Sequence, residues 1–268
     1  MAFSDYLRAH IFTGFPWNLW AYSTVWLNEI IQIVNSIGLY SYNLISITFF
    51  TLPAIIFFRI STTKKFLYSI LIIFALLNLF IFGNYEINKN KKKLKEVNDK
   101  VYIKIISPNF DLKYGLTEKQ IEERLKKLIR YSNPTKEKIT LFIWPEGVFS
   151  GYSYEEISAF NELITKNFSK EHTIIFGINR LDLNSGKFYN SMLAVDNNFK
   201  IIQEYNKRKL VPFGEFLPFE KFLNNFGLKK ITEGHGSFLK GNKNNNLSIY
   251  KTNILPLICY EVIFTNLI

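Results

Sequence analysis

The chain has 268 residues, of which 48% are hydrophobic and 17% aromatic, and its formal net charge at pH 7 is +11. This length allows one or two domains, and the apolar, aromatic-rich composition predicts a membrane portion. A basic chain suits anionic lipid or nucleic acid. We favour lipid and expect no nucleic-acid partner, because the basic residues flank apolar runs and form no face with stacking aromatics. The single cysteine excludes an internal disulfide, and the three scattered histidines show no metal-ligand spacing.

Two long uncharged runs lie in the first third of the chain. No charged residue occurs within Ile30–Phe58 or within Phe66–Tyr85. A helix needs about 20 apolar residues to cross the hydrocarbon core of a bilayer. We therefore expect two transmembrane helices, near 39–58 and 66–84, with a kink at Pro53 in the first. Two buried helices of a large soluble protein are the alternative, which is disfavoured because two such runs rarely lie so close together in soluble domains.

The charges around these runs give an orientation and a domain boundary. The loop 59–65 is short and basic, which is typical of the cytoplasmic side of a membrane. The basic segment 88–100 argues the other way, but long domains cross membranes largely regardless of charge. We therefore expect residues 1–87 to form the membrane region, 88–100 a charged linker, and 101–268 a domain outside the cytoplasm.

Beyond the linker, short apolar runs alternate with helical patterns, which predicts an α/β domain whose helices cover a sheet. Helices are expected over 117–131 and 154–167, and Thr117 with Gln120 forms a capping box at the start of the first. Runs of four to eight β-favouring residues bounded by turn signals predict the strands 101–107, 140–144, 173–178, 191–195 and 254–259. Functional residues of such domains usually follow strand ends.

Three of these ends carry reactive side chains. Glu146 ends the tripeptide W-P-E, Lys207 lies in Y-N-K-R-K-L, and Cys259 begins C-Y-E. Each signal is weak alone: a strand-end cysteine is more often a small buried hydrophobe, W-P-E is usually a turn, and the lysines of a basic protein are usually solvated, as we expect for Lys209. The combination of a carboxylate, an amine and the sole thiol indicates nucleophilic catalysis.

These motifs, in this order, resemble the Glu-Lys-Cys triad of the carbon-nitrogen hydrolase (nitrilase) superfamily. The resemblance implies catalytic roles for Glu146, Lys207 and Cys259, and a four-layer α-β-β-α sandwich preceded by transmembrane helices. The motif Thr13–Trp17 before the spans and the motif Leu210–Glu215 after the lysine are similar to those of bacterial apolipoprotein N-acyltransferases. That family has more spans before the first motif and more chain after the cysteine, so we interpret the sequence as a fragment truncated at both ends, with an incomplete sandwich.

The resemblance implies transfer of a fatty acyl group from a membrane phospholipid, through a thioester on Cys259, to the N-terminal amine of a diacylglyceryl-cysteine apolipoprotein. Glu146 would act as the base, and Lys207 would stabilise the oxyanion together with a backbone N–H. The supporting residues implied are Glu215, Tyr260 (through its N–H) and Glu261. The resemblance also implies a multi-pass protein of the bacterial inner membrane, with its catalytic domain on the periplasmic face and no cofactor.

Two other functions remain open from the sequence. A membrane-anchored nitrilase-type amidase would use the same triad on a small soluble amide, although such an enzyme does not need the paired spans. An inactive fragment is the second, because strands missing from the sandwich would leave an exposed sheet edge.

The resemblance to the acyltransferase family also implies that Tyr114 lies in a lipid-gating loop, at a position where a tryptophan is common.

Overall fold

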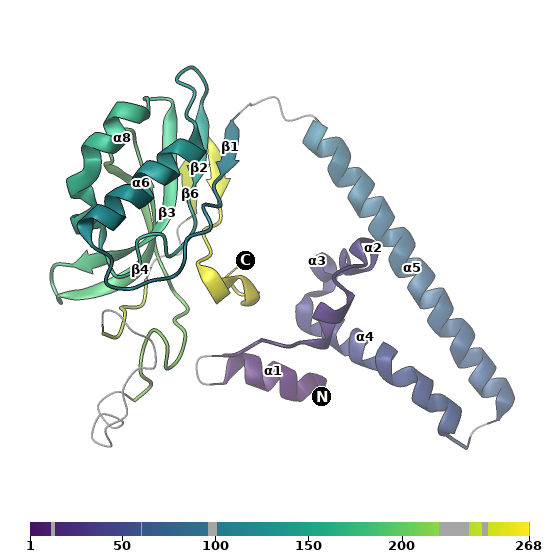
Figure 1. The fold of residues 1–268 in the computed structure, drawn as a ribbon. Coiled ribbons are helices and arrows are strands. Elements are labelled where there is room, and N and C mark those ends of the chain that lie inside the picture. Colours follow the sequence, from purple (N-terminus) through teal and green to yellow (C-terminus); the bar gives the residue numbers. More distant parts are fainter. Residues whose placement is uncertain (12–13, 60, 96–100, 220–235, 243–245, 268) are drawn as a thin grey trace. The chain divides into compact units, whose positions relative to one another are not determined.

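The computed structural model describes residues 1–11, 14–59, 61–95, 101–219, 236–242 and 246–267 (Figure 1). The chain divides into two compact units, Met1–Asp99 and Lys100–Ile268. Thr13 of the first motif and residues 96–100 of the expected linker lie outside the described residues.

The first unit is helical throughout its described elements. Its helices are α1 (Ala2–His10), η1 (Trp20–Thr24), α2 (Asn28–Ile31), α3 (Val34–Ile37), α4 (Leu39–Thr51), η2 (Leu52–Phe57) and α5 (Thr62–Lys95), where η marks a 3₁₀ helix. The buried apolar residues Leu19, Ala21 and Tyr42 form a small core where η1 meets α4. The Asn43 side chain closes this junction, because it accepts from Ala21 N at 3.0 Å and donates to Asp5 Oδ2 at 3.0 Å.

Helix α5 is long and apolar enough to cross a membrane. The candidate span covers Thr62–Lys93, which corresponds to about 48 Å at 1.5 Å per residue, and only 6% of its most apolar window is buried. The apolar segment Leu39–Ile55 is shorter and changes from α4 to the 3₁₀ helix η2 next to Pro53. A second span therefore stays a prediction. The basic residues from Lys89 to Lys95 form the last turns of α5.

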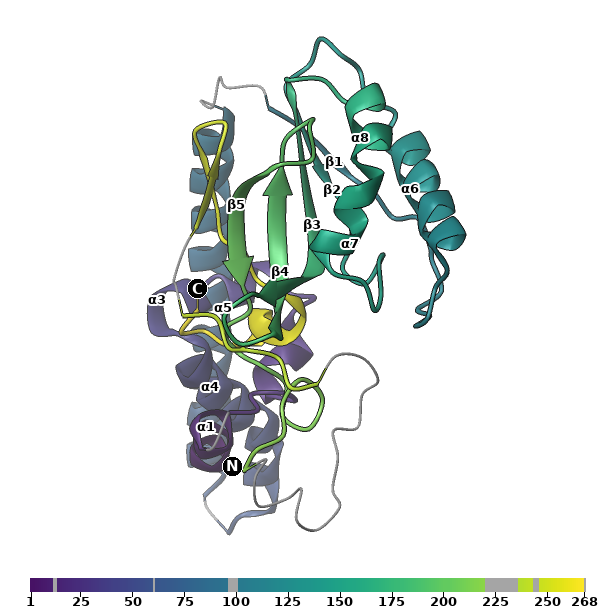
Figure 2. The same cartoon turned by 90° about the vertical axis from the view of Figure 1, so that its left-hand side faces the viewer.

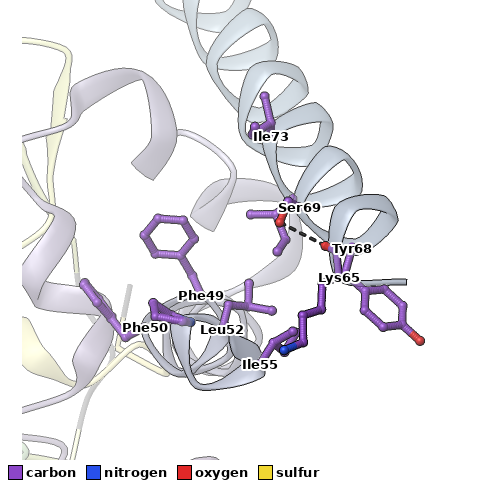
Figure 3. Close-up of a pocket in the computed structure, with 10 residues that line it drawn as sticks. Phe49, Phe50, Leu52, Ile55, Lys65, Tyr68, Ser69 and Ile73 are labelled. Atoms are coloured by element: carbon purple, nitrogen blue, oxygen red, sulfur yellow. Dashed lines mark hydrogen bonds between the residues drawn. The ribbon is translucent and has the colours of Figure 1, made fainter. Parts of the chain in front are cut away.

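Apart from Tyr42 and Asn43, which bond residues outside α4, several polar side chains of α4 and α5 are satisfied within their own helix. Each donates to the carbonyl oxygen four residues earlier, as seen for Ser46, Thr48, Thr51, Ser69, Asn78 and Asn84. Figure 3 shows Ser69 at a cavity of about 350 Å³ between η2 and the first turns of α5, with Phe49, Ile55 and Ile73 among its lining residues. Helices whose hydroxyls and amides need no water are suited to a lipid environment.

The second unit is built on a five-stranded mixed sheet. Its strands, in spatial order, are β1 (Tyr102–Ile105), β2 (Thr140–Ile143), β3 (His172–Asp182), β4 (Lys187–Val195) and β5 (Ile201–Asn206). The first three run parallel, whereas β3, β4 and β5 pair antiparallel. A separate hairpin joins β6 (Leu247–Ile249) to β7 (Thr252–Ile254). The expected strands β1 to β4 are confirmed, and β5 was not expected.

Apolar side chains of β2, β3 and β4 are buried on both faces of this sheet, whereas most of β1 is exposed. On one face Phe142, Ile174 and Leu193 pack with the helices, and on the other Leu141 and Ile175 pack with the β6–β7 hairpin. Figures 1 and 2 show the helices and the hairpin on opposite sides of the sheet. A sheet that is apolar on both faces must be covered on both. The expected α/β sandwich is confirmed in its described part, with helices covering one face of the sheet and the β6–β7 hairpin covering the other.

The helices of the second unit follow local capping chemistry. Helix α6 (Glu118–Ser132) starts with the expected capping box: Gln120 N donates to Thr117 Oγ1, and Thr117 N to Gln120 Oε1. The single helix expected over 154–167 is wrong. It is divided into α7 (Tyr154–Ile157), η3 (Ser158–Phe160) and α8 (Asn161–Asn167). The hydroxyl of Ser158 donates to the Glu155 carbonyl at 2.7 Å and competes with the helical hydrogen bond there.

The strand expected over 254–259 is also wrong. Only Ile254 belongs to a strand, the chain is irregular from Leu255 to Ile258, and the 3₁₀ helix η4 (Cys259–Ile263) follows. Pro256 has no N–H to donate to a sheet ladder, and the N–H of Ile258 is bound by the Glu261 carboxylate at 2.9 Å. The cysteine therefore lies in a turn.

Candidate active site

Glu146 is held just beyond the end of β2. The preceding Trp144 is buried, its N–H continues the ladder to Ile175 O at 2.8 Å, and its indole Nε1 donates to Ser132 Oγ at 3.0 Å. Gly177 of the neighbouring strand β3 leaves room for the carboxylate side chain. A Cβ at this glycine would lie 3.3 Å from both Cα and Cγ of Glu146. The absence of a side chain on β3 thus allows Glu146 to lie against the sheet.

Lys207 follows β5 and points into the protein. Its N–H donates to Asn190 O at 2.9 Å, so the pairing with β4 continues one residue past the strand. The side chain is 1% exposed, and its ammonium Nζ lies 2.9 Å from Glu215 Oε1 and 5.7 Å from the centroid of the Tyr260 ring. A buried ammonium requires such a partner, because an unpaired buried charge costs several kcal/mol.

Asn190 connects this ion pair to Glu146. Its side-chain Nδ2 donates to Glu215 Oε1 at 2.9 Å and to Glu146 Oε1 at 3.2 Å. The other oxygen of Glu215 accepts from Val211 N at 2.9 Å. Asn190 was not among the predicted site residues. Its only signal was an amide side chain within an otherwise β-favouring strand.

Cys259 is a free, exposed cysteine. It is the first residue of η4, and its φ of 54° lies in the left-handed region that residues with a side chain rarely adopt. Such a conformation costs about 1–3 kcal/mol and persists only where the surroundings impose it. The exposure excludes the role of a small buried hydrophobe for this cysteine.

Glu261 joins the segment that carries Lys207 to the turn that carries Cys259. It is 0% exposed, and its carboxylate accepts from Ile258 N at 2.9 Å, Arg208 N at 2.7 Å and Lys209 N at 2.9 Å. The phenol of Tyr205 donates to the same carboxylate at 3.0 Å. Burial, together with the Glu261 charge, raises the pKa of Tyr205 well above its ordinary value. Four donors from two segments thus converge on one buried anion.

Tyr260 follows Cys259 and Lys209 lies two residues after Lys207, and neither side chain is fully exposed. Tyr260 is buried, and burial raises the pKa of its phenol to about 12, with Glu215 contributing further. Lys209, expected to be solvated, is half-buried with its ammonium 5.0 Å from the centroid of the Phe264 ring. Burial lowers the pKa of Lys209.

Two cavities of about 390 Å³ each meet at Glu146 and Cys259. One is partly polar, and its lining includes Asn190, Glu215 and Tyr114. The other is largely apolar, and its lining includes Ile143, Pro145, Ile175, Met192, Leu255, Leu257 and Ile258. The arrangement therefore gives a thiol and a carboxylate access to a polar space and an apolar space at once. Among the described residues, no group of three or more His, Cys, Asp or Glu side chains is placed to hold a metal ion.

Comparison with known proteins assigns the family. The model of the carbon-nitrogen hydrolase family matches residues 110–268, and that of the apolipoprotein N-acyltransferase N-terminal domain matches residues 1–52. The apolipoprotein N-acyltransferase of Rhodopseudomonas palustris is 29% identical over 98% of this chain and 51% of its own length. That of Wigglesworthia glossinidia brevipalpis is 32% identical over 97% of this chain and 50% of its own.

The chain thus spans about half the length of the curated relatives it matches. A solved N-terminal amidase bound to an Asn-Glu-Ala peptide shares 22% identity over 41% of this chain and 28% of its own, with a TM-score of 0.27, a similarity too low to support an argument. The carbon-nitrogen hydrolase match, by contrast, covers more than half of the chain. This protein belongs to the carbon-nitrogen hydrolase family.

Proposed function

We propose that this chain carries the acyl-transfer chemistry of an apolipoprotein N-acyltransferase. The donor would be a membrane phospholipid, and the acceptor the N-terminal amine of a diacylglyceryl-cysteine lipoprotein. One observation carries the proposal: the exposed thiol of Cys259 lines the same cavity as Glu146, whose carboxylate is hydrogen-bonded through Asn190 to the buried Lys207–Glu215 pair. The similarity to curated apolipoprotein N-acyltransferases over nearly the whole chain supports this choice of acyl donor and acceptor.

The first half-reaction loads the acyl group on the enzyme. A free thiol titrates near pH 8.5 and needs a base to attack at neutral pH. Glu146 takes the thiol proton, and the sulfur of Cys259 attacks the ester carbonyl of the phospholipid. The C–S bond forms, the acyl C–O bond breaks, and Glu146 returns the proton to the oxygen of the departing lysophospholipid. The ammonium of Lys207 and the backbone N–H of Tyr260 stabilise the oxyanion between these steps.

The second half-reaction releases the acyl group to the lipoprotein. The neutral α-amine attacks the thioester carbonyl, the C–N bond forms and the C–S bond breaks. One amine proton passes through Glu146 to the sulfur of Cys259, which restores the thiol and the carboxylate. Glu215 and Glu261 act as supports, since Glu215 fixes the Lys207 ammonium and Glu261 ties the lysine segment to the cysteine turn.

A membrane location fits both substrates. The outward-facing apolar surface of α5 suits lipid, and an enzyme tethered in the bilayer meets its substrates at a high effective concentration. We propose a multi-pass protein of the bacterial inner membrane. The basic loop 59–65 would lie on the cytoplasmic side and the catalytic unit on the periplasmic side.

The mass of the intact, membrane-expressed protein before and after neutral hydroxylamine tests this function. We expect a fatty-acyl mass increment that hydroxylamine removes and that Cys259→Ala lacks. The chain has one cysteine, so the site of a thioester is unambiguous. An increment that persists in Cys259→Ala would contradict the proposal. Turnover of short soluble amides with no acyl increment would instead identify an amidase.

A further inference from the structure

Arg124 is a buried arginine whose described hydrogen bonds go to backbone carbonyls, and the Asp111 carboxylate is the charge that acts on it. It lies on α6, is 9% exposed, and is the only charged residue among the buried positions of that helix. Its two terminal nitrogens donate to backbone carbonyls: Nη2 to Asp111 O at 2.7 Å and Nη1 to Val148 O at 2.9 Å. The Phe110 ring covers the guanidinium, with the ring centroid 4.8 Å from Cζ.

The two carbonyls belong to two different loops. Asp111 lies in the loop 106–117 after β1, and Val148 lies in the loop 144–153 after β2. Strands β1 and β2 are parallel neighbours, so these loops leave the same edge of the sheet. A second bond joins them, because the phenol of Tyr152 donates to Leu116 O at 2.6 Å.

Both loops line the partly polar cavity at Cys259. The loop after β1 contributes Leu112 and Tyr114, whose side chains remain largely exposed. The loop after β2 contributes Glu146 and the lining residues Gly147, Phe149, Ser150 and Gly151. At the cavity the two loops lie against each other, with Leu112 beside Gly147 and Tyr114 beside Gly151, and the described hydrogen bonds that join them come from Arg124 and Tyr152.

We propose that Arg124 is a positioning residue that holds these two loops in place at the cavity and thereby selects the size of the group that reaches Cys259. The planar guanidinium offers two parallel donors at a fixed spacing, which matches two carbonyls on separate loops. A lysine has a single point of charge and cannot hold both with this geometry. An arginine required only for packing would not need both carbonyls. The selected group is an acyl donor if the proposed function holds, but the selection itself does not depend on turnover.

The single cysteine allows a direct test on the full chain in lipid nanodiscs. The rates of Cys259 alkylation by small N-methylmaleimide and by bulky N-pyrenylmaleimide are compared in wild type, Arg124→Gln and Arg124→Lys. Arg130→Gln, an exposed arginine on the same helix, is the matched control. In Arg124→Gln we expect the preference for the small reagent to fall about tenfold, the size of effect that loss of steric discrimination produces. Arg124→Lys should recover only part of it, and Arg130→Gln should match wild type.

The hydrogen bond from Tyr152 to Leu116 provides an independent variant in case Arg124→Gln folds poorly. Tyr152→Phe removes only the hydroxyl that reaches Leu116, and we expect a smaller loss of preference in the same direction. Unchanged preference in both variants would overturn the proposal, as would an equal change with both reagents accompanied by a lower Tm. Because alkylation needs no substrate, a wild-type protein that forms no acyl-enzyme would disprove the proposed function and leave this test intact.

Discussion

The two units of the chain satisfy their polar side chains over very different distances. In α4 and α5 of the first unit, hydroxyls and amides bind carbonyls four residues earlier in the same helix. In the second unit, Glu261 binds donors 52 to 56 residues away, and Asn190 reaches a glutamate 44 residues away. Apart from Tyr42 and Asn43, which bond residues outside α4, these helices thus satisfy their polar side chains locally, whereas the candidate site exists only when the whole second unit is folded.

The apolar residues differ in the same way. The most apolar window of α5 is almost entirely unburied, while the sheet of the second unit has apolar clusters on both faces. Lipid must therefore cover the apolar surface of α5, as other parts of the protein cover the apolar faces of the sheet. Perturbations of the surroundings should act on the first unit, and loss of a single buried partner should act on the second.

Of the variants below, Glu261→Gln is expected to have the largest effect: it should destabilise the second unit and leave the first unchanged. The amide group replaces one acceptor oxygen with a donor, so at least one buried N–H loses its partner and the anion that four donors share is gone. We expect a loss of roughly 3–5 kcal/mol in the free energy of unfolding. Near-ultraviolet circular dichroism in detergent measures it, and membrane insertion should be unchanged. A variant as stable as wild type would show that this carboxylate does not hold the two segments together.

Comparing Lys207→Met with Lys209→Met distinguishes the role of a buried lysine from that of its half-buried neighbour. Removing the Lys207 ammonium takes away a donor at the candidate oxyanion and leaves Glu215 without its cation. We expect acyl-enzyme formation to slow by about 10²–10³, the usual loss for one such donor. Lys209→Met should stay within about threefold, because its ammonium lies over Phe264. The rate of the hydroxylamine-sensitive mass increment measures both, and equal losses would contradict the assignment to Lys207.

Leu77→Lys tests the other unit. Leu77 is 55% exposed near the middle of α5, where a lysine costs about 3 kcal/mol of membrane insertion. We expect a larger fraction of the protein to be extracted by alkaline carbonate. Leu183→Lys is the control, because this leucine is also exposed, at 85%, and lies in the turn between β3 and β4 of the second unit. If both variants behave alike, the contrast between the two surfaces fails.

Local features of the sequence predicted most of the sheet, because the residues of β1 to β4 alternate or run continuously apolar and are bounded by turn signals. Helix α6 was predicted to within one residue for the same reason, since its capping box is local. The strand expected at 254–259 failed because the partner of Ile258 N is the carboxylate of Glu261, a tertiary choice that hydrophobicity does not reveal.

The candidate site likewise contains residues that local motifs predicted and residues that only tertiary contacts reveal. Glu146, Lys207 and Cys259 were named from short motifs, and these roles stay predictions. Asn190 could not be named, because its contact with Glu146 depends on the register of β4 beside β5 and on the loop after β2. An asparagine within a strand gives no local sign of which carboxylate it will meet. Arg124 was likewise hidden, since a basic residue in an amphipathic helix usually faces water.

Tyr205→Phe is expected to have the smallest effect, because it removes one hydrogen bond and one titrating phenol. Burial and the Glu261 charge raise the pKa of the Tyr205 phenol above its ordinary value of 10.0. Below pH 10 the phenol is protonated in both states, so its contribution to stability is constant. Above pH 10 the unfolded chain loses the proton while the folded one keeps it, and stability falls by up to about 1.4 kcal/mol per pH unit. We expect Tyr205→Phe to remove this part of the slope of Tm between pH 10 and 12. An unchanged slope would mean that the phenol ionises freely in the folded protein, and that Glu261 is less enclosed than the second unit's long-range contacts require.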